Sequence, residues 1–77
     1  MENEILKNAD KNFDEGNIEK ALNQYFDYLF AQEPSSYLYM KIAHCNLLLK
    51  DIENAKEYYE KSLEYDSQNY ESIYNLA

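Results

Sequence analysis

The chain has 77 residues, a net charge of −8, nine tyrosines and no valine, threonine or arginine. Lacking valine and threonine, two strong strand formers, and having a single glycine and a single proline, it is predicted to be all-α. Fifteen acidic against seven basic residues disfavour nucleic acid and anionic membranes as partners. Apolar runs fall short of the ~20 residues that span a bilayer, and residues 1–12 do not resemble a signal peptide, so we expect a cytoplasmic protein.

Four amphipathic helices are expected. The first covers residues 2–14, where apolar side chains recur at helical spacing. Gly16 can adopt the left-handed conformation that ends a helix. The second helix covers residues 18–32 and stops before Pro34. Ser35 or Ser36 can cap the third helix.

The third helix, residues 37–49, is the most apolar segment, and we expect other helices to contact it on more than one side. Lys50 replaces the glycine of the first turn, so a left-handed conformation there would cost about 1–2 kcal/mol. Asp51 can cap the fourth helix, residues 52–65. A fifth helix begins near Tyr70. Because the connections are short, neighbouring helices should form antiparallel hairpins.

The sequence aligns with itself at an offset of 34 residues. This period is typical of helix–turn–helix solenoids, which generally bind other molecules. At the most informative positions, Ala9 aligns with Ala43 and Ala77, Ala21 with Ala55, Tyr25 with Tyr59, and Leu29 with Leu63.

These residues resemble the tetratricopeptide repeat family. The matching residues are Ile5, Ala9, Gly16, Ala21, Tyr25, Leu29 and Pro34 in one unit and Tyr39, Ile42, Ala43, Leu47, Ala55, Tyr59 and Leu63 in the next. The resemblance implies one α-solenoid domain over residues 1–77, with antiparallel repeats in a right-handed superhelix. The repeats would be about 2–35, about 36–69 and a truncated 70–77. Tyr28 and Ser62 depart from the family pattern, which prefers alanine there.

In this family the first helix of each unit lines a concave wall that binds a peptide or partner protein. The resemblance therefore implies a protein-interaction module for an extended or helical peptide with hydrophobic side chains. The alternative for Leu6, Met40 and Leu48 is packing within or between helices. Carried over by position, the wall comprises Leu6, Lys7, Asp10, Phe13, Tyr37, Met40, Lys41, His44, Leu48 and Tyr74.

Other surfaces and roles remain open at this point. Phe26, Phe30 and Tyr58 are predicted to face outward on the second helices, where they could contact a partner. Tyr25 and Tyr59 are predicted to cover seams between the helices.

Two further alternatives concern self-association and a role within a larger protein. Ile73 and Leu76 of the fifth helix could support self-association into a homo-oligomer. The chain could also be the regulatory arm of a larger enzyme or sensor.

The adjacent pair His44 and Cys45 is the only hint of chemistry in the sequence. Neighbouring helical residues point about 100° apart, so the two side chains could not chelate one ion together. No second histidine or cysteine is available to complete a metal site or a catalytic pair. We therefore predict no catalytic residues, no metal, no cofactor and no enzymatic activity, and expect Cys45 to pack between helices.

Overall fold

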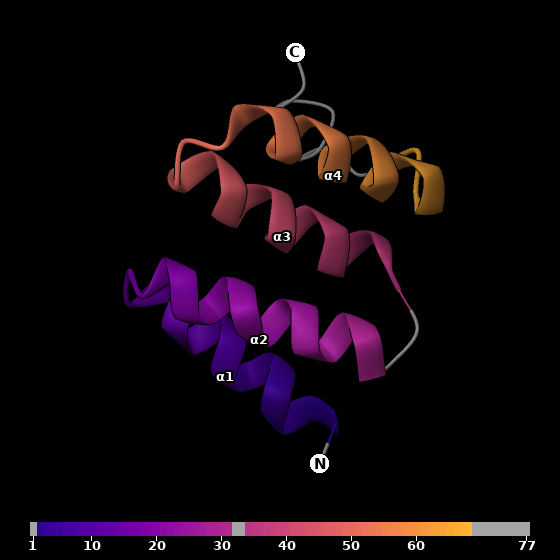
Figure 1. Ribbon diagram of the computed structural model, residues 1–77. Coiled ribbons are helices and arrows are strands. Elements are labelled where there is room, and N and C mark those ends of the chain that lie inside the picture. The colour runs from indigo at the N-terminus through magenta and orange to yellow at the C-terminus, as the bar shows by residue number, and fades with distance from the viewer. Residues whose placement is uncertain (1, 32–33, 69–77) are drawn as a thin grey trace.

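The computed structural model describes residues 2–31 and 34–68, which form two stacked helix hairpins (Figure 1). The four helices are α1 (Glu2–Asp14), α2 (Ile18–Ala31), α3 (Ser36–Leu48) and α4 (Ile52–Tyr65). Each helix boundary lies within one residue of its predicted position, and the described ranges contain no strand. The all-α prediction is therefore confirmed, whereas the fifth helix predicted near Tyr70 lies outside the described residues.

Both hairpin turns use the same backbone motif. Gly16 and Lys50 have φ angles of 86° and 66°, so each adopts the left-handed conformation expected at its turn. The N–H of each donates to the carbonyl three residues earlier, at 3.1 and 3.0 Å. The N–H of the following residue donates to the carbonyl five residues earlier, at 2.8 Å in both turns. These hydrogen bonds satisfy the last carbonyls of α1 and α3 and reverse the chain.

The two helices of the second hairpin begin at the predicted capping residues. The Ser35 side chain accepts a hydrogen bond from the N–H of Leu38 at 3.1 Å. The Asp51 carboxylate accepts one from the N–H of Asn54 at 3.3 Å. Each cap satisfies a donor that has no partner inside its helix, which fixes where α3 and α4 start.

Within the described residues, the core has two clusters, and α3 contributes to both. Cys45 is fully buried, as predicted, and the contribution of α3 to both clusters confirms that other helices contact it on more than one side. The first cluster joins the two hairpins and contains Ala9, Ala21, Tyr25, Leu38, Ile42 and Cys45. The second lies within the second hairpin and contains Met40, Ala43, Ala55 and Tyr59.

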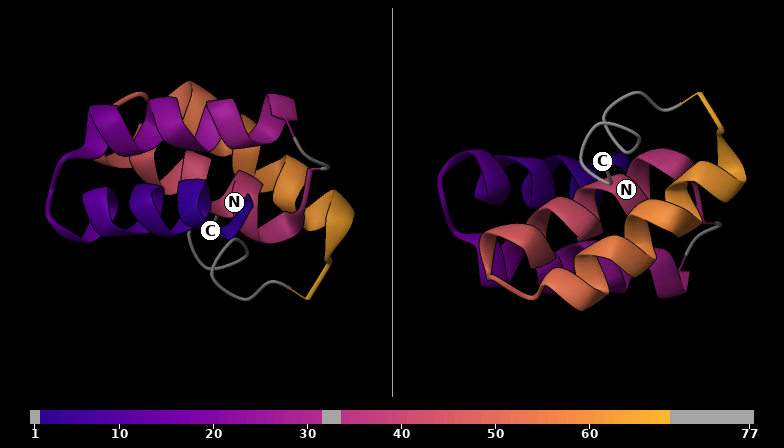
Figure 2. Two further views of the ribbon diagram at one scale, coloured as in Figure 1. Left: turned by 90° about the horizontal axis from the view of Figure 1, so that it is seen from below. Right: turned by 90° about the horizontal axis from the view of Figure 1, so that it is seen from above.

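The hairpins do not stack in parallel. In the view from above in Figure 2, α3 and α4 run obliquely to α1 and α2, so the second hairpin is rotated relative to the first. None of the described helices is both long and apolar enough to cross a membrane.

Ser62 explains one departure from the family pattern. Its side chain is fully buried, and its hydroxyl donates to the Ser36 carbonyl at 2.8 Å. The Ser36 and Ser62 hydroxyl oxygens lie 2.9 Å apart in a second hydrogen bond. A serine at this position therefore holds α4 against the start of α3, at a place where a buried hydroxyl needs a partner.

Candidate interaction surface

Side chains of α1 and α3 meet across the boundary between the two hairpins. The Lys41 ammonium of α3 lies 3.7 Å from the centroid of the Phe13 ring of α1. The same ring lies 6.3 Å from the His44 ring, measured between centroids. A cation at this distance from an aromatic face contributes about 0.5–1 kcal/mol at an exposed site. These contacts place three predicted site residues side by side.

Asp10 connects three helices through its carboxylate. One oxygen accepts a hydrogen bond from the buried Tyr25 hydroxyl of α2. The other accepts one from the Tyr37 hydroxyl of α3 at 3.0 Å. Burial, followed by the hydrogen bond to Asp10 and the charge of Asp10, raises the pKa of Tyr25 far above its usual value. Tyr25 therefore remains a hydrogen-bond donor at neutral pH and holds Asp10 in place.

His44 is held in an equivalent way by α4. Its Nδ1 atom forms a hydrogen bond with the Tyr59 hydroxyl, and the two rings meet edge to face with centroids 5.4 Å apart. Tyr59 is 1% exposed, so a core residue fixes the orientation of His44.

The structure thus brings together five of the predicted wall residues. They come from both hairpins and form two sets of contacts: Asp10 with Tyr37, and Phe13 with Lys41 and His44. We call Asp10, Phe13, Tyr37, Lys41 and His44 the α1–α3 contact group. Tyr37 is 43% exposed and the other four are half-buried, so the group presents surface to solvent.

The remaining predicted wall residues have different surroundings. Lys7 is exposed, and Leu48 is 56% exposed. Leu6 is half-buried and packs against the first core cluster. Met40 is only 7% exposed and belongs to the second cluster, so packing accounts for it. The tenth residue, Tyr74, lies outside the described residues.

The sequence interpretation missed that the hydroxyl groups of Tyr25 and Tyr59 contact two residues of the predicted wall. It assigned both residues to packing, and both are indeed buried. A signal was nevertheless present, because Asp10 aligns with His44 at the same 34-residue offset that aligns the two tyrosines. A buried tyrosine hydroxyl needs a partner, and the repeat supplies one at the equivalent position in each hairpin.

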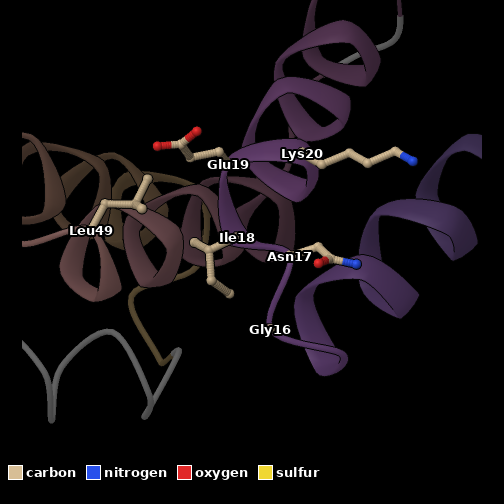
Figure 3. Close-up of a pocket in the computed structure, with 6 residues that line it drawn as sticks. All are labelled: Gly16, Asn17, Ile18, Glu19, Lys20 and Leu49. Carbon is tan, nitrogen blue, oxygen red and sulfur yellow. The ribbon is translucent and has the colours of Figure 1, made fainter.

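A separate hollow lies at the turn end of the molecule. Figure 3 shows Ile18 and Leu49 facing it from α2 and from the end of α3, while Lys20 extends in the opposite direction. It shares no residue with the predicted wall. Its lining is Gly16, Asn17, Ile18, Glu19, Lys20 and Leu49.

Cys45 is placed for packing. Burial raises the pKa of its thiol to about 12, although the nearby Lys41 charge acts in the opposite direction. A thiol that stays protonated at neutral pH is a poor nucleophile and a poor metal ligand. Across residues 2–31 and 34–68, no three histidine, cysteine, aspartate or glutamate side chains are grouped so that they could hold a metal ion.

Two hairpins with the same turn, and with the same tyrosine contact at equivalent positions, define an all-α helical repeat protein. Residues 36–69 match a family model described as a tetratricopeptide repeat. Neither a curated protein nor a solved structure matches the chain significantly. Repeats of this family are scaffolds that mediate protein–protein interactions. That residues 2–35 form a second complete unit remains a prediction.

Proposed function

We propose that the predicted wall residues of α1 and α3, which we call the α1–α3 wall, bind a peptide segment of another protein. The observation that carries this proposal is the α1–α3 contact group, in which the exposed Tyr37 and four half-buried side chains make two sets of contacts between the hairpins. The match of residues 36–69 to a tetratricopeptide repeat model supports a protein partner, and the residues of the wall support the side on which it binds.

The chemistry of the wall suits a peptide with hydrophobic side chains. Phe13, Tyr37 and Leu48 offer apolar surface along α1 and α3. Lys7 and Lys41 add hydrogen-bond donors that can reach peptide carbonyls. An extended or a helical segment could place alternate or successive anchors on such a wall.

The wall is also organised before a ligand arrives. Tyr25 holds Asp10, and Tyr59 holds His44, from the buried side. Side chains that are already fixed lose little conformational freedom on binding, so more of the contact energy remains available for affinity.

Peptide selection followed by NMR mapping tests the proposal. Twelve-residue peptides would be selected by display against the 77-residue chain, and the best one titrated into the isotope-labelled protein. We expect the amide shifts to concentrate on α1 and α3. Tyr37→Ala and Leu48→Ala should each weaken binding by about tenfold, because both remove exposed contact area from the wall. Met40 is an unsuitable probe, since its truncation would disturb the core.

Glu60→Ala on the exposed surface of α4 is the matched control and should leave affinity unchanged. Circular dichroism would establish that each variant remains helical. Shifts confined to α2 and α4, with full affinity in both wall variants, would refute the proposal.

A further inference from the structure

Five aromatic rings form a continuous series on another part of the molecule. We call Phe26, Phe30, Tyr39, Tyr58 and Tyr65 the aromatic ladder. Phe30 stacks on Phe26 with centroids 6.3 Å apart, and Phe26 meets Tyr58 edge to face at 5.9 Å. Tyr58 stacks on Tyr39 at 6.0 Å, and Tyr39 contacts Tyr65 at 5.5 Å. The contact between Phe26 and Tyr58 links α2 to α4, so the ladder crosses from one hairpin to the other.

The two ends of the ladder are open to solvent, whereas its middle is anchored. Phe30 is 83% exposed and Tyr65 is 55% exposed. Phe26 and Tyr58 are half-buried and pack against the first core cluster. Core packing therefore explains the positions of Phe26 and Tyr58 but leaves the exposed end rings, Phe30 and Tyr65, unexplained. Exposed aromatic groups linked across two hairpins are typical of a contact surface.

The charges around the ladder are mostly negative. Asp27 precedes Phe30 by three residues and so shares its helical face. Glu64 and Asp66 flank Tyr65 and are exposed. Burial first, and then the charge of Glu57, raises the pKa of Tyr58, while Lys61 acts in the opposite direction. Among these described neighbours of the ladder, four carboxylates stand against one ammonium group.

We propose that the aromatic ladder binds an arginine-bearing basic segment of a partner protein. A guanidinium group stacks on aromatic faces and loses little hydration in doing so, which suits the open rings of Phe30 and Tyr65. The surrounding carboxylates attract the positive charge of such a segment.

The chain's own composition argues against the other occupants of this surface. A second copy carries a net charge of −8 and no arginine, so it would bring like charge to an acidic surface. Nucleic acid is repelled for the same reason. This surface is distinct from the α1–α3 wall, because the two share no residue.

Two peptides of equal charge test the proposal. Hexa-arginine amide and hexa-lysine amide would be titrated into the isotope-labelled 77-residue chain at 150 mM NaCl and followed by NMR. We expect hexa-arginine to bind several-fold more tightly and to shift signals of Phe30, Tyr58 and Tyr65. Phe30→Leu combined with Tyr65→Leu should weaken hexa-arginine binding by about fivefold or more while leaving hexa-lysine binding nearly unchanged.

The leucine variants keep apolar side chains and remove the rings, together with the hydroxyl of Tyr65, so they separate ring-specific binding from general hydrophobic contact. Should the double variant fail to fold by circular dichroism, Phe30→Leu alone provides the same comparison at the more exposed position. Tyr65→Phe keeps the ring and should bind normally, as should Tyr37→Leu on the α1–α3 wall.

Three results would overturn the proposal. Equal affinity for both peptides with no effect of the leucine variants would indicate diffuse attraction to an acidic protein. Shifts confined to the α1–α3 wall would place the basic segment elsewhere. Concentration-dependent self-association in sedimentation that disappears in Phe30→Leu would make a second copy the occupant.

Discussion

Tyr25 and Tyr59 each place a buried hydroxyl on the residue 15 positions earlier, Asp10 in one hairpin and His44 in the other. The tyrosine is retained at the two equivalent positions, while the surface residue changes from an acid to an imidazole. Each ring fills the core, and its hydroxyl fixes a side chain on the predicted wall. Each of the two residue pairs therefore links core packing to the proposed binding surface.

Tyr25→Phe isolates the hydroxyl from the ring. Phenylalanine retains the packing but leaves Asp10 without its buried donor, so we expect the free energy of unfolding to fall by about 1–2 kcal/mol. Urea denaturation at pH 7 would measure the change. Tyr37→Phe removes the donor to the other carboxylate oxygen from a 43% exposed residue, where water can replace it. It should cost at most about 0.5 kcal/mol, and an equal cost for both variants would contradict the role of burial.

Cys45 makes stability depend on pH under alkaline conditions. Its thiol pKa is raised from 9.0 to about 12 on folding, so the folded state keeps the proton that the unfolded state loses above pH 9. The unfolded state binds fewer protons in this window, and stability therefore falls as pH rises from about 9 towards about 12. We expect Cys45→Ala to show a shallower decline. Urea denaturation from pH 8 to pH 10 would test this, and parallel curves for the two proteins would exclude it.

At the scale of the element, the two hairpin turns share one backbone geometry but have different residues at the position of positive φ. Gly16 adopts positive φ freely, whereas Lys50 adopts it at a cost. The cost is tolerated because the same hydrogen bonds close both turns. The second turn is therefore a place where stability can be gained without any change in fold.

Lys50→Gly should raise the free energy of unfolding by about 1 kcal/mol, because glycine relieves the strain but makes the unfolded chain more flexible. Gly16→Ala should lower it by about 1 kcal/mol. A Cβ atom at Gly16 would meet no atom within 4 Å, so backbone conformation alone accounts for that loss. Lys50→Ala removes the charge without relieving the strain and serves as the control. A gain in Lys50→Ala equal to that in Lys50→Gly would assign the effect to charge, and chemical denaturation would distinguish the two.

Helices and turns could be predicted because they depend on local signals. Gly16, Ser35 and Asp51 mark helix ends through their own backbone and side-chain preferences. The surroundings of individual wall residues were harder to predict. Met40 lies on a helix that is apolar on most sides, so the sequence pattern does not reveal which side chains reach the core. The Tyr37–Asp10 contact joins residues 27 positions apart and depends on how one hairpin is rotated on the other.

At the scale of the whole molecule, the first core cluster holds the two hairpins together. Leu38, Ile42 and Cys45 of α3 pack with alanines and a tyrosine of α1 and α2. Neither hairpin can bury its apolar face alone, so the stability of each depends on the other. The α1–α3 wall and the aromatic ladder both cross this junction and exist only while it is intact.

Leu38→Ala tests this dependence. Leu38 is 1% exposed in α3, and its truncation should cost about 2–5 kcal/mol. A chain of this length has a total stability of roughly 4–12 kcal/mol, so the loss is a large fraction of it. We expect the amides of both hairpins to lose protection by similar factors in hydrogen exchange, because the cluster links the two. Leu48→Ala, 56% exposed in the same helix, should change protection little. Loss of protection in α3 and α4 alone, with α1 and α2 unaffected, would show that the hairpins unfold independently and that the junction does not couple them.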